Sequence, residues 1–172
     1  MIGNPLRLRR TLACAATAVL LVVAAQAQAP MPAQDFVNQT AVANMFGVEA
    51  ATLALSKSGS TAIKAFAHRI ADDQASATSG LRRIVAKRSD VALPDRPDGR
   101  HLELLRDLAG RQGPDFDKAY VDSQRRTHQE TATLMERYAK EGGDQELKSF
   151  AEQSLPLFRD LDRRARDLPA GP

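Results

Sequence analysis

Residues 60–89 read STAIKAFAHRIADDQASATSGLRRIVAKRS, and the apolar positions of this stretch recur every three or four residues. Such spacing is typical of an α-helix with one side against a core and the other side in solvent. Gly59 can end a preceding helix and Ser60 is a favourable N-cap, so a helix is expected to begin here. Its predicted inward stripe consists of Ile63, Phe66, Ala67, Ile70, Ala77, Leu81, Ile84 and Val85.

Three further long segments show the same helical period, and no segment alternates as a β-strand does. They cover residues 35–58, 115–141 and 144–168, and a shorter helix is expected at residues 101–108. Two prolines and a glycine in residues 93–99 separate the second long helix from the short one. The sequence therefore predicts an all-α fold, a four-helix bundle with a short extra helix in the central crossover.

Two faces of these helices are predicted to point into the core. On the first helix the face consists of Phe36, Thr40, Asn44, Gly47, Val48, Ala51 and Leu55. On the third long helix it consists of Phe116, Tyr120, Gln124, His128, Thr131, Met135 and Tyr138. Several members are polar, which makes the centre of the bundle the natural place to look for a site.

The first 27 residues have the three parts of a cleavable signal peptide. Arginines at positions 7, 9 and 10 precede an apolar run over residues 11–25, and Ala25-Gln26-Ala27 supplies the small residues that signal peptidase requires. The run of about 15 residues is shorter than the roughly 20 that a membrane-spanning helix needs, so a cleaved leader is favoured over an uncleaved anchor. We predict cleavage after Ala27 and export to the periplasm.

The predicted organisation is a signal peptide over residues 1–27, a spacer over 28–34, the helical domain over 35–168 and a tail over 169–172. The pair Arg9-Arg10 is also compatible with twin-arginine export, so the route stays open. Cys14 starts the apolar run instead of following it, so lipid modification is not expected.

Removal of the leader would change the charge of the chain. The leader holds three of the 24 Lys and Arg residues and none of the 21 Asp and Glu residues, which leaves 21 of each sign. A chain without net charge, without Trp and with two Tyr offers no basic or aromatic surface for nucleic acid. The single cysteine also lies in the leader, so disulfides and thiolate chemistry are excluded from the mature chain, in which no transmembrane segment is expected.

Short motifs in a fixed order then indicate a family. They are FAHRIADD at residues 66–73, DFDKAY at 115–120 and THQ at 127–129, followed by Phe150-Ala151 and Leu155-Pro156. With these motifs the chain resembles, over residues 36–165, the bacterial exported ferritin-like family called domain of unknown function 4142. The resemblance implies a ferritin-like four-helix fold and brings no established reaction with it.

Ferritin-like bundles bind metals through carboxylates and histidines that project into the core. The resemblance implies four such positions, which fall on Gly47, Gln74, His128 and Leu161 of this chain. Only His128 keeps a strong donor, and one imidazole with one amide is too small a set to hold a transition metal. We therefore predict no metal, no cofactor and no catalytic residue.

Other polar residues receive plain interpretations. Glu49 lies two residues after Gly47, about 200° around the helix, and is expected to point away from the core. His128 is expected to be a buried core histidine that is hydrogen-bonded to Gln74 or Gln124.

His68 is expected on the surface, and Asp72-Asp73 on a solvated face because adjacent helical side chains diverge by about 100°. His101 begins the short helix with no partner in view.

The sequence thus favours an exported periplasmic bundle without enzymatic activity, with a binding, stress-related or envelope-associated role. Its partners are unknown, and a second copy of the chain or an envelope protein is the kind of partner left open. The alternative is a metal-binding ferritin-like protein or oxidase that uses His128 and Glu49.

Overall fold

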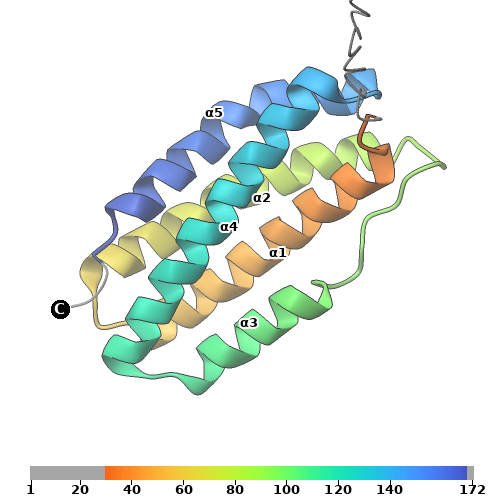
Figure 1. Ribbon diagram of the computed structural model, residues 1–172. Helices are drawn as coiled ribbons and strands as arrows, with labels where there is room; N and C mark the ends of the chain where they lie inside the picture. Colours follow the sequence, from red (N-terminus) through yellow and green to blue (C-terminus); the bar gives the residue numbers. More distant parts are fainter. Residues whose placement is uncertain (1–29, 170–172) are drawn as a thin grey trace, which may run out of the picture.

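The computed structural model describes residues 30–169, which form five α-helices and no β-strand within that range (Figure 1). The predicted leader, with Cys14 and the cut after Ala27, lies outside the described residues. The helices are α1 (Ala33–Lys57), α2 (Thr61–Val85), α3 (Gly99–Gly110), α4 (Gly113–Glu141) and α5 (Gln145–Asp167). Among these five, none has the length and apolar character that crossing a membrane requires.

Side-chain caps fix three of the helix starts. The hydroxyl oxygen of Ser60 accepts a hydrogen bond from the Ile63 N–H at 3.3 Å, which confirms the predicted start of α2. Asp144 caps α5 in the same way at 2.9 Å from the Leu147 N–H. Asp98 caps α3, so this helix begins two residues before the predicted residue 101. Each cap satisfies an N–H group that the first helical turn leaves free.

Two antiparallel hairpins make up the bundle. Helix α1 packs against α2 and α4 packs against α5, while α1 also contacts α4 and α2 contacts α5. The connection over residues 86–98 runs back along the bundle, so α3 lies on the outside, beside α1 and the start of α4 (Figure 1). This arrangement confirms the predicted four-helix bundle with a short helix in the crossover.

The predicted inward face of α4 is confirmed at all seven positions, which are buried. On α1 the prediction is wrong at Val48, which is 38% exposed, whereas Phe46 and Ala50 are fully buried. The reason is the position of α3. Because α3 packs on the side of α1 that carries Phe46, with the Phe46 ring 5.2 Å from the His101 ring, the buried surface of α1 is shifted toward α3.

Candidate functional site

The four positions that the resemblance marks for metal donors are all buried in the bundle. Gly47 of α1 faces Gln74 of α2, and the contact between them is very close. A Cβ atom on Gly47 would lie 2.6 Å from Nε2 and 2.7 Å from Cδ of Gln74, and closer still to Oε1. The amide of Gln74 therefore occupies the space beside the bare Cα of Gly47, where a longer side chain at position 47 would have to pass.

His128 of α4 is 1% exposed, and its ring centroid lies 5.8 Å from that of Phe66 on α2. The prediction that it is buried is confirmed, but its ring makes no hydrogen bond to the side-chain amide of Gln74 or of Gln124. Within the described residues neither ring nitrogen has a hydrogen-bond partner. The amide of Gln74 lies against Gly47 instead, and the amide of Gln124 is itself without a partner in the same part of the chain.

The environment of His128 decides its charge. Burial lowers the pKa of His128 to about 4, although the negative charge of Asp162 on α5 and the backbone oxygen of Gln124 act in the opposite direction. Removing an imidazolium from water is costly, and here the cost of burial outweighs both of these favourable effects. The ring is therefore neutral at neutral pH.

The surroundings of His128 do not fit a transition metal. Gly47 offers no side chain, Leu161 is fully buried and apolar, and Gln74 offers a neutral oxygen. Glu49 is exposed, as predicted, so it does not replace the missing carboxylate. Across residues 30–169, no group of three or more His, Cys, Asp or Glu side chains is placed to hold a metal ion. Borderline divalent metals need several such donors in one coordination shell.

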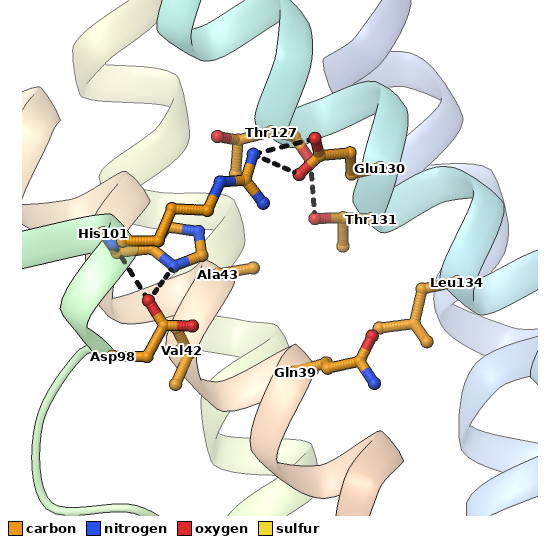
Figure 2. Close-up of a pocket in the computed structure, with 10 residues that line it drawn as sticks. Gln39, Val42, Ala43, Asp98, His101, Thr127, Glu130, Thr131 and Leu134 are labelled. Carbon is orange, nitrogen blue, oxygen red and sulfur yellow. Dashed lines mark hydrogen bonds and ion pairs between the residues drawn. The ribbon is translucent and has the colours of Figure 1, made fainter. Parts of the chain in front are cut away.

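A separate pocket of about 130 Å³ opens between α1, the start of α3 and α4 (Figure 2). Apolar side chains from α1 and α4 form part of its wall, and polar and charged side chains from α1, the start of α3 and α4 form the rest. Its lining residues are Gln39, Val42, Ala43, Asp98, Arg100, His101, Thr127, Glu130, Thr131 and Leu134. The sequence did not predict this pocket, because it depends on where the crossover places α3.

His101 lies in the wall of this pocket, and the expectation that it has no partner is wrong. Its Nδ1 is 2.7 Å from Oδ1 of Asp98, the residue that also caps α3 (Figure 2). Burial alone would raise the pKa of the Asp98 carboxyl, but the hydrogen bonds from the backbone N–H and the ring of His101 bring it below its usual value. The sequence carried a signal for this pair, since an aspartate three residues before a histidine places both at the first turn of one helix.

Arg100 and Glu130 join α3 to α4 at the same pocket. One guanidinium nitrogen of Arg100 donates to both carboxylate oxygens of Glu130, at 2.8 and 2.9 Å. Both side chains are about half exposed, so the pair contributes little to stability. The ion pair does neutralise the charge of Arg100, and the hydrogen bond to Glu130 raises the pKa of the Arg100 guanidinium.

The remaining candidates lie on the surface, as predicted. His68 and Asp72 are exposed, and Asp73 pairs with Arg69 one turn away, at 2.5 Å. The acidic and basic side chains of α5 pair with one another in the same i, i+4 pattern. These side chains lie on solvated helix faces. Within the described residues none of these faces forms a site from the candidate residues.

A sequence profile of the family described as domain of unknown function (DUF4142) matches residues 20–168. The chain belongs to this family. The match confirms the relationship indicated by the motifs at residues 66–73, 115–120 and 127–129. A search of curated proteins and a search of solved structures gave no match.

One threonine in the lining of the pocket of this DUF4142 chain has a buried hydroxyl. Thr127 lines the pocket, is 2% exposed, and has no hydrogen-bond partner for its hydroxyl within the described residues. Because Val has the same shape, Thr127→Val should remove an uncompensated dehydration cost and raise the free energy of unfolding by about 1 kcal/mol. Urea unfolding at pH 7 measures this change.

The matched control for that prediction is Thr133→Val on the same helix. Thr133 is exposed, and its hydroxyl donates a hydrogen bond to the backbone oxygen of Gln129 at 2.9 Å. A surface change of this kind should stay within about 0.5 kcal/mol of the parent protein. A loss of stability in Thr127→Val larger than that of the control would show that the buried hydroxyl is satisfied in solution.

Proposed function

We propose that this chain is an exported, periplasmic, non-catalytic binding protein whose ferritin-like bundle lacks a metal centre. The observation that carries the proposal is the contact between Gln74 and Gly47, because it fills the space in which a donor at position 47 would lie. Of the four positions implied by the family, this leaves His128 as the single strong donor.

A binding role is supported by the state of the titratable groups. His128 is neutral and has no acid or base partner in the described residues, so it is not placed for proton transfer. Near the pocket, the side chains of Asp98 and His101 are paired with each other, as are those of Arg100 and Glu130. Because each titratable group of the lining is held in such a pair, the pocket favours binding over proton transfer. The periplasmic location is inferred from the predicted leader over residues 1–27.

The experiment that tests this proposal is metal analysis of the protein isolated from its own periplasm without refolding. We expect no stoichiometric iron, manganese or zinc. One tightly bound equivalent that disappears in His128→Ala, and remains in the surface control His68→Ala, would overturn the proposal in favour of a metal-binding protein or oxidase. N-terminal sequencing of the same sample tests the export step, with Gln28 expected as the first residue.

A further inference from the structure

The pocket between α1, α3 and α4 has the size of a site for one small organic molecule. Its volume of about 130 Å³ is close to that of cavities of about 150 Å³ that hold a benzene molecule in other proteins. A ligand of five or six non-hydrogen atoms therefore fits. The apolar part of the wall, formed by Val42, Ala43 and Leu134, can cover a short hydrocarbon chain.

The polar part of the wall presents hydrogen-bond acceptors. Asp98 is ionised at neutral pH, and its Oδ1 accepts a hydrogen bond from Nδ1 of His101 at 2.7 Å. Thr131 donates its hydroxyl proton to the backbone oxygen of Thr127 at 2.8 Å, so the hydroxyl oxygen of Thr131 can only accept further bonds. A ligand that donates hydrogen bonds matches these groups.

The charge of the wall also favours a cation. Asp98 and Glu130 are negative and Arg100 is positive, so the carboxylates and the guanidinium of the lining sum to one negative charge. The charge of Arg100 is already used by Glu130, at 2.8 and 2.9 Å. The positive end of α3 is likewise capped by the Asp98 carboxylate, which accepts the His101 N–H at 2.9 Å.

We propose that this pocket binds a small primary alkylammonium ion, with its N–H groups toward Asp98 and the hydroxyl oxygen of Thr131 and its alkyl chain against Val42, Ala43 and Leu134. The inference rests on the proposed binding function and names the ligand class. A metal ion does not fit, since the acids and histidine of the lining are not placed to hold one.

The test is a titration of the mature chain with n-butylammonium chloride, followed by ¹H–¹⁵N NMR. We expect saturable shifts of the amide signals of Val42, Thr127 and Thr131, with a dissociation constant at or below about 1 mM for so small a ligand. Neutral n-butanol and anionic butyrate, which have the same chain length, should bind at least about fivefold more weakly. Equal binding of either compound, or an absence of saturation with butylammonium, would overturn the inference.

Two variants locate the binding. Asp98→Asn keeps a favourable N-cap but removes the charge, so it should weaken butylammonium binding about fivefold or more. Asp107→Asn is the matched control, because Asp107 lies on the same helix and pairs with Arg111 away from the pocket. An equal effect of both variants would contradict the proposed site. A chain that carries no metal but binds no butylammonium would refute this inference alone, whereas a metal equivalent at His128 would refute the proposed function.

Discussion

Acidification from pH 7 to pH 4 is expected to lower the free energy of unfolding by about 3 kcal/mol through His128 alone. The pKa of this imidazole is about 4 in the folded chain and 6.5 in a solvated reference, with burial as the main cause of the difference. The unfolded chain therefore binds a proton that the folded chain does not. The stability from His128 is fully present above pH 6.5 and is lost as the pH falls from 6.5 through 4.

The effect of His128 can be separated from that of the carboxylates by a variant. Urea unfolding at several pH values between 7 and 4 should show a smaller loss for His128→Leu than for the parent protein, by about 3 kcal/mol at pH 4. His68→Leu removes an exposed histidine and should leave the pH dependence as in the parent protein. Parallel curves for the parent and His128→Leu would mean that His128 is solvated or hydrogen-bonded in the folded state.

Truncation of Phe66 is expected to have the largest effect on stability. Phe66 is 5% exposed on α2, and its ring packs beside that of His128 on α4. Phe66→Ala should therefore cost about 3–5 kcal/mol, through lost burial and the cavity that remains. Urea unfolding at pH 7 measures the cost.

Val48→Ala provides the comparison for this truncation, because Val48 is the large apolar side chain that remains exposed on α1. We expect its free energy of unfolding to stay within about 0.5 kcal/mol of the parent protein. If Phe66→Ala were as mild as Val48→Ala, the inward face assigned to α2 would be wrong.

The helical periodicity of the sequence predicted most of the fold. The face of α4 from Phe116 to Tyr138 was predicted completely, because this helix lies against the core along its whole length. Val48 was misplaced because the buried face of α1 also depends on α3, which packs beside Phe46. The spacing of apolar residues in the sequence indicates which face of a single helix is buried, but the position of a crossover helix is decided by packing between distant segments.

The same distinction applies to the sites. The family positions Gly47, Gln74 and His128 were predicted to lie in the core, and they do. The direct contact of Gln74 with Gly47 could not be predicted, since it depends on the rotamer of a glutamine side chain across two helices. The pocket beside His101 was missed for a related reason, because its walls come from three helices that are far apart in the sequence.

The central claim is that the Gln74 amide fills the space beside Gly47 and so closes the centre of the bundle. A thermodynamic cycle of Gly47→Ala, Gln74→Ala and the double variant tests it most directly, by urea unfolding at pH 7. In the parent protein the new methyl group would overlap Gln74, so Gly47→Ala should destabilise the fold by about 1 kcal/mol despite its better helix propensity.

In the Gln74→Ala background the same change has room, and it should stabilise the fold by about 1 kcal/mol, as alanine does in a helix interior. A change of sign between the two backgrounds is the predicted result. If Gly47→Ala stabilised both proteins equally, the Gln74 amide would move aside without cost, and it would not close the centre of the bundle.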